Sequence, residues 1–151
     1  MAYDFELSKV DLEIIRLLQE DPRSFSKIAG TLDLSVGTIY NHVKKLEEKG
    51  ILTGYTVRVD SNKLGYDLTV FTLLQIDEHN RAKVARELAQ FENIIAFYAI
   101  TGKYDMLVIG RFKSRTMLNN FIKKIQKIPI VKKTFVHVAL DVIKEDFRLK
   151  L

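Results

Sequence analysis

Residues 34–55 of the chain read LSVGTIYNHVKKLEEKGILTGY, and this stretch decides the first half of the fold. Ser35 is a favoured N-cap residue, because its hydroxyl accepts a hydrogen bond from a backbone N–H of the first helical turn. Apolar residues then recur at helical spacing, and Gly50 is a favoured residue at a helix end. The stretch predicts a helix over residues 36–49 with an apolar stripe formed by Val36, Ile39, Val43 and Leu46.

Two shorter helices are expected before this one. Ser8 is followed three residues later by Asp11 and begins an amphipathic pattern that Pro22 stops. A second helix is expected to begin at Ser24, and Asp33 then forms a tight turn into the third helix. This succession predicts a helix-turn-helix domain over residues 1–50.

The chain after residue 50 changes from helical to β-type patterns. Residues 51–59 are rich in β-forming residues and predict a wing or linker strand, and Asp60-Ser61-Asn62 marks a boundary. Strands are then expected at 68–76, 94–101, 105–112 and 131–143, with helices at 80–90 and 114–128. This βαββαβ order is ferredoxin-like. We therefore expect an α+β protein with a winged-helix-like domain over 1–50, a strand and linker over 51–66, and a ferredoxin-like domain over 67–151.

Both faces of the predicted strands are apolar. In the first strand Val70 and Leu74 alternate with Phe71 and Leu73. Two helices can cover only one face of a four-stranded antiparallel sheet, and a bare apolar face of that size is normally an interface. The pattern predicts a homodimer, with Val138 among the residues of the uncovered face.

Composition excludes several functional classes. The 151 residues include no cysteine, so disulfides, thiolate zinc sites and cysteine nucleophiles are absent. No apolar run approaches the roughly 18 residues of a membrane span, and Met1-Ala2-Tyr3-Asp4 lacks the pattern of a signal peptide, so we expect a cytoplasmic protein without a membrane partner. The histidines His42, His79 and His137 are scattered, and no catalytic or metal-binding motif is found. We therefore expect no enzyme activity, no metal and no cofactor.

The positive charge is unevenly distributed. The formal net charge is +5, yet residues 1–60 hold eight basic and ten acidic residues, whereas residues 61–151 hold sixteen and nine. The excess lies mostly outside the predicted helix-turn-helix, so net charge is weak support for DNA binding. A thermophile composition rich in Lys, Glu and Ile would explain it equally well.

The outward face of the third predicted helix carries small, amide and basic side chains. At about 100° per residue, the positions that point away from Ile39 are Gly37, Thr38, Asn41, Lys44, Lys45 and Glu48. An asparagine can read adenine with two hydrogen bonds, and lysines can contact phosphates or guanine. Any solvated helix is also polar on its outer face. Arg23, Lys27 and Arg58 are further candidate phosphate contacts, and each is equally consistent with a solvated side chain.

Several stretches together resemble the N-terminal signature of the Lrp/AsnC (leucine-responsive/asparagine) family of transcription regulators. They are Asp21-Pro22-Arg23, Ile28-Ala29, Leu34-Ser35-Val36-Gly37-Thr38-Ile39 and the run from Leu46 to Tyr55. The resemblance covers nearly the whole chain. It implies a sequence-specific regulator that binds double-stranded DNA through a winged or strand-linked helix-turn-helix, with a ferredoxin-like domain that senses an amino acid. It also implies assemblies larger than a dimer.

Two departures from the family pattern concern DNA reading. The segment between Arg23 and Ser35 is one residue shorter than usual, and His42 stands where arginine is common. Loss of an arginine removes a strong phosphate or guanine contact, which predicts a different operator preference. We expect His42 to be an exposed flanking residue and not a pH switch.

The loop Thr101-Gly102-Lys103-Tyr104-Asp105 resembles the glycine, aromatic and aspartate loop that helps to form the effector pocket in that family. Asp105 is then the expected partner of an amino acid's ammonium group, and backbone N–H groups at Gly102 and Lys103 are the donors to its carboxylate. The plain alternative is a connection between strands in which glycine permits the turn.

Two other functions are weighed against DNA-binding regulation. A ferredoxin-like domain can bind RNA, but the strand expected over 105–112 lacks the basic, glycine and aromatic pattern that stacks RNA bases. The stronger alternative is an oligomeric metabolite sensor that does not bind DNA.

Overall fold

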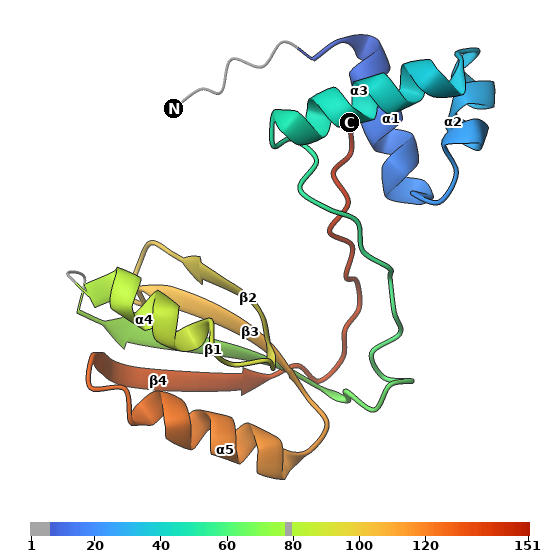
Figure 1. The fold of residues 1–151 in the computed structure, drawn as a ribbon. Helices are drawn as coiled ribbons and strands as arrows, with labels where there is room; N and C mark the ends of the chain where they lie inside the picture. The colour runs from blue at the N-terminus through green and yellow to red at the C-terminus, as the bar shows by residue number, and fades with distance from the viewer. Residues whose placement is uncertain (1–6, 78–79) are drawn as a thin grey trace. The chain divides into compact units, whose positions relative to one another are not determined.

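The structure is a computed structural model, and it describes residues 7–77 and 80–151 (Figure 1). Contacts divide the chain into two compact units, which we describe separately. The first ends at Arg58 and also includes Asp146–Leu151, and the second is Val59–Glu145. The chain start, where we expect no signal peptide, and His79 lie outside the described residues.

The first unit contains the three expected helices, α1 (Lys9–Glu20), α2 (Phe25–Leu32) and α3 (Val36–Glu48). Each begins after a serine whose side chain accepts a hydrogen bond from the backbone N–H three residues later. These serines are Ser8, Ser24 and Ser35. Such a cap stabilises a helix by about 1 kcal/mol. At α1 the bond is reciprocal, because the Asp11 carboxylate also accepts from the Ser8 backbone at 2.9 Å.

A tight turn sets the angle between α2 and α3. Asp33 adopts the left-handed conformation, with φ 53° and ψ 45°, which aspartate tolerates better than most residues. The Leu34 N–H donates to the Ala29 carbonyl at 2.9 Å, and Ser35 then begins α3. Gly50, with φ +67°, follows the end of α3. The predicted helix-turn-helix is therefore confirmed.

The small core of this unit lies between the three helices. It consists of Ile14, Leu18, Ile28, Ala29, Ile39 and Val43. Val36 is a correction to the predicted stripe, since it is 47% exposed. It is the first residue of α3, and at 100° per residue it lies at the edge of the stripe that Ile39, Val43 and Leu46 form.

The second unit is a four-stranded sheet with two helices. The strands are β1 (Leu68–Ile76), β2 (Ile94–Ala99), β3 (Met106–Phe112) and β4 (Val131–Val138). Their spatial order is β2-β3-β1-β4, and every neighbouring pair is antiparallel. With α4 (Arg81–Leu88) after β1 and α5 (Arg115–Gln126) after β3, the predicted ferredoxin-like arrangement is confirmed.

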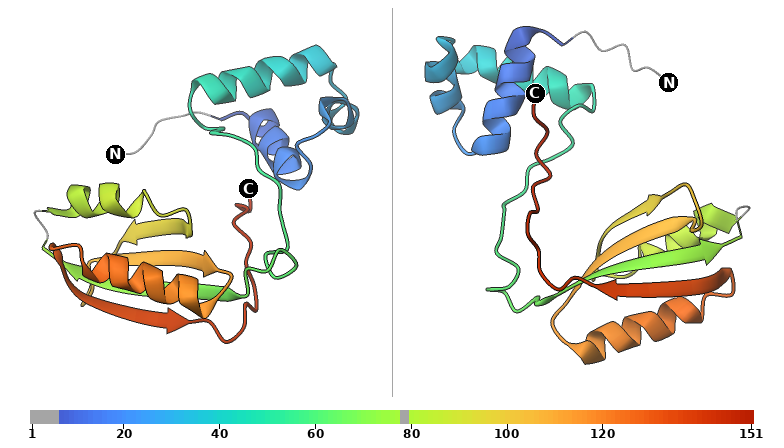
Figure 2. Two further views of the ribbon diagram at one scale, coloured as in Figure 1. Left: turned by 60° about the horizontal axis from the view of Figure 1, so that its bottom comes forward. Right: turned by 180° about the vertical axis from the view of Figure 1, so that it is seen from behind.

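Both helices cover one face of the sheet (Figure 2). Val70 and Leu74 of β1 lie buried in one cluster with Val84 and Leu88 of α4 and with Phe121 of α5. Phe71 and Leu73 alternate with them and therefore belong to the opposite face. In β4, Val138 pairs with Val70 and so lies on the helix side of the sheet. Our placement of Val138 on the uncovered face is wrong by one position, and a one-residue error in strand register exchanges the two faces.

Residues 52–60 form no strand, contrary to the expected wing or linker strand. A strand needs a hydrogen-bonded neighbour, and the single chain supplies none here. Within this segment, the Tyr55 hydroxyl donates to the Glu47 carboxylate at 3.1 Å. Among the described residues, no helix is both long and apolar enough to cross a membrane.

Candidate functional site

The outer face of α3 is positioned by the helix core beneath it. Ile39, Val43 and Leu46 are buried, which turns Gly37, Asn41, Lys44, Lys45 and Glu48 outward, where all five are exposed. Thr38 is half-buried, and its backbone N–H and its hydroxyl both form hydrogen bonds with Ser35 Oγ, at 3.0 Å and 2.8 Å. Thr38 therefore serves the helix cap first.

The exposed polar side chains of α3 differ in whether they already have a partner within the chain. Lys44 lies 3.9 Å from the Glu48 carboxylate in an exposed pair, and such pairs are weak. The side chains of Asn41 and Lys45 have no hydrogen bond or ion pair within residues 7–77 and 80–151. Their donors and acceptors are thus available to a ligand.

Arg23 lies between α1 and α2 and forms a pair with Asp21, with Nε 2.8 Å from Oδ1. The hydrogen bond from the Arg23 side chain lowers the pKa of Asp21 to about 2, and the Asp21 carboxylate in turn raises the pKa of Arg23. The Arg23 side chain is 86% exposed. A phosphate that bound Arg23 would have to compete with Asp21.

His42 is not the exposed flanking residue that we expected. Its Nδ1 lies 2.7 Å from Asp11 Oδ1, and its side chain is 31% exposed. Burial opposes ionisation of Asp11, but hydrogen bonds from His42 and Ser8 outweigh burial and hold the pKa of Asp11 below its ordinary value. His42 thus joins α3 to the capping box of α1. No local pattern indicates this contact, because the partners are separated by 31 positions.

The loop Thr101–Asp105 connects β2 to β3, and its geometry depends on Gly102. Gly102 has φ +108°, a conformation that L side chains rarely adopt. The Ile100 N–H donates to the Asp105 carbonyl at 3.0 Å and closes the connection. Thr101 and Lys103 are exposed. This geometry meets the needs of a plain strand connection and also leaves the loop open to a ligand.

Asp105 fastens the start of β3 to β1. Its Oδ2 accepts a hydrogen bond from the Ile76 N–H at 2.8 Å, and its own N–H donates to the Leu74 carbonyl at 2.9 Å. The other carboxylate oxygen, Oδ1, has no partner among the described residues. One oxygen thus holds the fold, and the second can accept from an ammonium group.

Tyr104 brings the loop to the uncovered face of the sheet. Its ring centroid lies 5.0 Å from that of Phe135 in β4, and Lys103 Nζ lies 5.7 Å from the Tyr104 ring. Phe135 is 37% exposed. The candidate effector loop therefore borders the face through which we expect a second subunit to pack.

Arg111, near the end of β3, is a residue that sequence reasoning missed. Its guanidinium contacts the Ser61 hydroxyl and the Glu145 carboxylate, and its side chain is only 13% exposed. Ser61 and Glu145 lie close to the two points where the chain enters and leaves the second unit. A partly buried arginine with two polar contacts thus fixes both connections to one strand.

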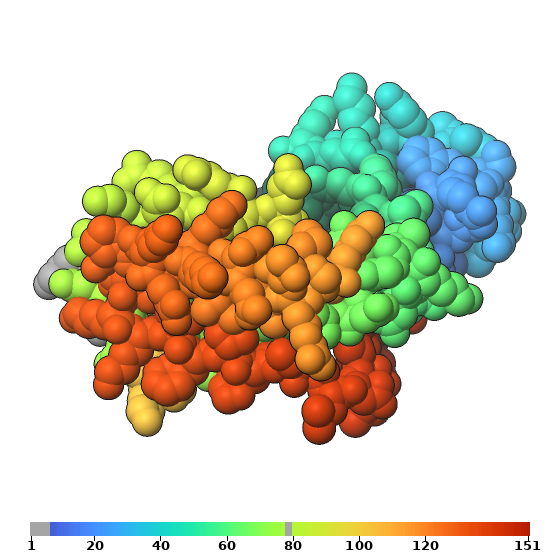
Figure 3. Space-filling model, turned by 90° about the horizontal axis from the view of Figure 1, so that it is seen from below, coloured from blue at the N-terminus to red at the C-terminus, as the bar shows by residue number. Residues whose placement is uncertain are grey.

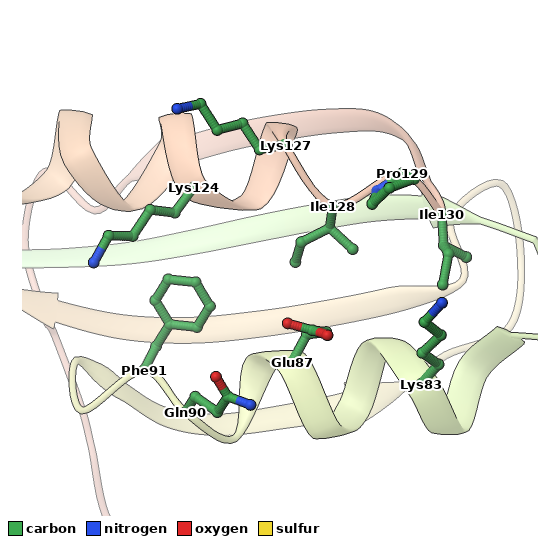
Figure 4. A pocket seen from close by; sticks show the side chains of 9 residues that line it. All are labelled: Lys83, Glu87, Gln90, Phe91, Lys124, Lys127, Ile128, Pro129 and Ile130. Carbon is green, nitrogen blue, oxygen red and sulfur yellow. The ribbon is translucent and has the colours of Figure 1, made fainter.

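A groove of about 420 Å³ lies between α4 and α5 (Figure 4). It is lined by Lys83, Glu87, Gln90, Phe91, Lys124, Lys127, Ile128, Pro129 and Ile130. It contains none of the predicted site residues. Across the described ranges, no group of three or more His, Cys, Asp or Glu side chains is arranged to hold a metal ion.

Comparison with known families and proteins extends over both units. Residues 69–149 match the Lrp/AsnC ligand binding domain, and residues 7–53 match a winged helix-turn-helix DNA-binding domain. The chain is 41% identical to an uncharacterized HTH-type transcriptional regulator of Pyrococcus furiosus, over 96% of this chain and 99% of that protein. It is 36% identical to the HTH-type transcriptional regulator FL11 of Pyrococcus horikoshii, over 96% and 97%.

Solved structures share the fold at lower identity. A transcriptional regulator of Neisseria meningitidis in complex with L-methionine superposes with a TM-score of 0.88 at 22% identity, over 95% of this chain and 96% of that one. AsnC of Escherichia coli superposes with a TM-score of 0.81 at 23% identity, over 97% and 98%. With both domains matched in order and regulators at up to 41% identity, the chain belongs to the Lrp/AsnC family of transcription regulators.

Proposed function

We propose that this chain reads duplex DNA with the outer face of α3, and that an amino acid bound at the loop Thr101–Asp105 alters its DNA binding or its assembly. The family consists of transcription regulators and not of enzymes, so the chemistry to explain is recognition. The observation that carries the proposal concerns Asn41 on the outer face of α3. This helix is capped by Ser35 and follows the Asp33 turn, and the Asn41 side-chain amide has no hydrogen-bond partner among the described residues.

Within the proposed interface the residues of α3 have different tasks. Asn41 is suited to read adenine through N6 and N7, and Lys44 and Lys45 are suited to phosphates or guanine. Gly37 lies in the first turn, and a Cβ placed there would meet only Ser35 Oγ, at 3.7 Å. Packing within the chain does not demand glycine at this position. A closely approaching DNA backbone would.

The DNA half of the proposal is tested by fluorescence anisotropy with a selected duplex. Asn41→Ala should cost roughly 1 to 3 kcal/mol on that site and relax its base preference. Lys45→Ala should weaken binding to all sequences alike. It should also make the slope of log affinity against log salt concentration shallower by about 1. Unchanged affinity and specificity in both variants would show that another face meets DNA. No binding by the wild type would favour the sensor that does not bind DNA.

For the effector we propose a free amino acid. Methionine is bound in the neighbouring Neisseria structure, and a zwitterion needs an acceptor for its ammonium group and donors for its carboxylate. In the loop, Asp105 Oδ1 can be the acceptor, and the exposed backbone around Gly102 and Lys103 can supply donors. Thr101 and Tyr104 add hydroxyl groups.

The effector half needs a substitution that spares the fold. Asp105→Asn keeps an oxygen to accept from the Ile76 N–H and removes the negative charge, whereas alanine would also lose the strand contact. Calorimetry against the twenty amino acids should find at least one ligand, and Asp105→Asn should weaken it about tenfold or more. Asp67→Asn, an exposed aspartate of the same unit, is the control. A ligand that bound Asp105→Asn as well as wild type would place the pocket elsewhere.

The uncovered sheet face is the proposed dimer interface. On β1 and its two neighbours, β3 and β4, the apolar residues of this face are Phe71, Leu73, Leu107, Ile109 and Phe135. A second copy that packed against this face would also lie beside Tyr104 and so beside the effector loop. Ligand binding could then favour one assembly over another through different affinities for the two states. We also propose assemblies of several dimers, and we keep 1–50, 51–66 and 67–151 as the functional division of the chain.

A further inference from the structure

The two helices of the second unit carry an excess of basic residues. Within α4 and α5, six residues are Lys or Arg and one, Glu87, is acidic. Figure 3 shows the two helices side by side at the surface, α4 in yellow-green and α5 in orange. We define the basic helix layer as five exposed residues of the helices and the α5 C-cap, namely Lys83, Arg86, Lys123, Lys124 and Lys127.

None of these five cations has an ion-pair partner in the described part of the chain. Three arginines of the first unit behave differently, since Arg16, Arg23 and Arg148 each pair with a carboxylate within 3.0 Å. Lys124 is also 6.0 Å from the Phe91 ring, a contact that leaves its ammonium group available to an anion. The layer is therefore a concentration of uncompensated positive charge.

The shape of the layer fits an extended anion better than a compact one. Lys83 and Lys124 lie at opposite ends of the groove, with Glu87 between them (Figure 4). Stepping 100° per residue from the buried positions, Arg86, Lys123 and Lys127 point away from the sheet. The cations thus spread over two helices and do not converge on one point. A small anion would meet one or two of them, whereas a phosphate chain can meet several.

We infer that the basic helix layer is a second DNA-binding surface, which contacts the phosphate backbone without reading sequence. This inference rests on the proposed DNA-binding function. The charge distribution supports it, because residues 1–60 carry more acidic than basic residues and cannot by net charge attract DNA from a distance. Phosphate contacts position a protein and carry most non-specific affinity, while base contacts specify the site. In this chain the two tasks fall to different units.

The test compares two full-length variants with equal charge loss. The layer variant is Lys123→Gln/Lys124→Gln/Lys127→Gln. The control is Lys63→Gln/Lys132→Gln/Lys144→Gln, whose exposed lysines belong to the same unit but lie before β1, at the start of β4 and after β4. Binding to a long random-sequence duplex is measured over a range of salt concentrations. If all three lysines contact phosphates, the layer variant should show a slope of log affinity against log salt that is shallower by about 3. The control should keep the wild-type slope.

A further variant, in which the outer face of α3 is altered, separates this inference from the proposed function of α3. In Asn41→Ala/Lys45→Ala, preference for the selected site should fall, while residual binding to random DNA should persist and disappear when the layer substitutions are added. If wild type shows no site preference at all, the proposed function fails. If site preference is normal but the layer and control variants lose equal affinity, or neither loses any, the layer is not a DNA-binding surface. A layer variant that loses only binding of inorganic phosphate would likewise overturn the inference in favour of a small-anion site.

Discussion

Asp11 shows how one residue can serve two helices. Its carboxylate accepts from Ser8 in the cap of α1 and lies against His42 of α3, at 2.7 Å, while 8% of the residue is exposed. Loss of the charge affects both contacts together. The recognition helix is thereby fixed to the start of the domain by a polar contact as well as by its apolar core.

We expect Asp11→Asn to lower the free energy of unfolding by about 1 kcal/mol at pH 7, the usual scale of a cap. The pKa of Asp11 is lowered in the folded state, so its contribution is present above the ordinary value of 3.8 and is lost as the pH falls through the folded-state pKa. The difference between variant and wild type should therefore shrink on acidification. Urea unfolding between pH 7 and pH 3 measures it, with Glu13→Gln, an exposed acid of α1, as the control. A constant difference over that range would contradict this role.

Gly37 allows folding and DNA contact to be separated at one position. Alanine fits there without a clash and is favoured over glycine in helices by up to about 1 kcal/mol, so Gly37→Ala should be at least as stable as wild type. DNA affinity should nevertheless fall several-fold if the backbone approaches DNA closely. Gly30→Ala, in α2 with nothing within 4 Å of the added Cβ, should gain stability and keep its affinity. Thermal melts and anisotropy suffice, and equal DNA binding by both variants would argue against close approach at Gly37.

At the scale of elements, local patterns predict what local physics determines. The bounds of β1 agree with the prediction at Leu68 and Ile76, because a short, largely apolar run between Asp67 and Asp77 specifies a strand. The three serine caps were also predictable from local sequence, because serine is favoured directly before the apolar pattern of a helix. The segment 51–59 was not, since its β-forming residues have a strand's composition but no neighbour in the chain.

The candidate sites were predictable to different degrees. The outer face of α3 follows from helical periodicity alone, and the loop around Gly102 follows from a resemblance. The pairs that tie elements together were out of reach, because Arg111 meets Ser61 and Glu145 across 50 and 34 positions. The face to which Val138 belongs was also missed, since it depends on the register of β4 against β1.

Arg111 predicts a local effect at the edges of the second unit. Arg111→Met should leave the Glu145 carboxylate without its partner, lower stability by about 1 to 3 kcal/mol, and speed proteolytic cleavage near Ser61 and Glu145. Arg148→Met, which removes an exposed pair with Asp146, should change neither property noticeably. Limited proteolysis with mass spectrometry identifies the cut sites. Equal cleavage of both variants would show that Arg111 does not hold these connections.

At the scale of the whole molecule, the uncovered face of the sheet predicts self-association. Leu107→Asp places a charge near the start of β3 on that face and should produce monomers or aggregates. Val138→Asp, on the helix side at the end of β4 and already 44% exposed, should leave the assembly intact. Light scattering at micromolar concentration distinguishes the two. A monomeric wild type would end the dimer proposal.

The central claim is that one molecule reads DNA and senses an amino acid. Selection of bound sites from random duplex DNA, performed with and without each amino acid, tests both activities in one measurement. A twofold dimer should enrich an inverted repeat whose half-sites lie about one helical turn, or a multiple of it, apart. At least one amino acid should change the yield or the spacing of the enriched sites. Failure to enrich any sequence under every condition would contradict the account.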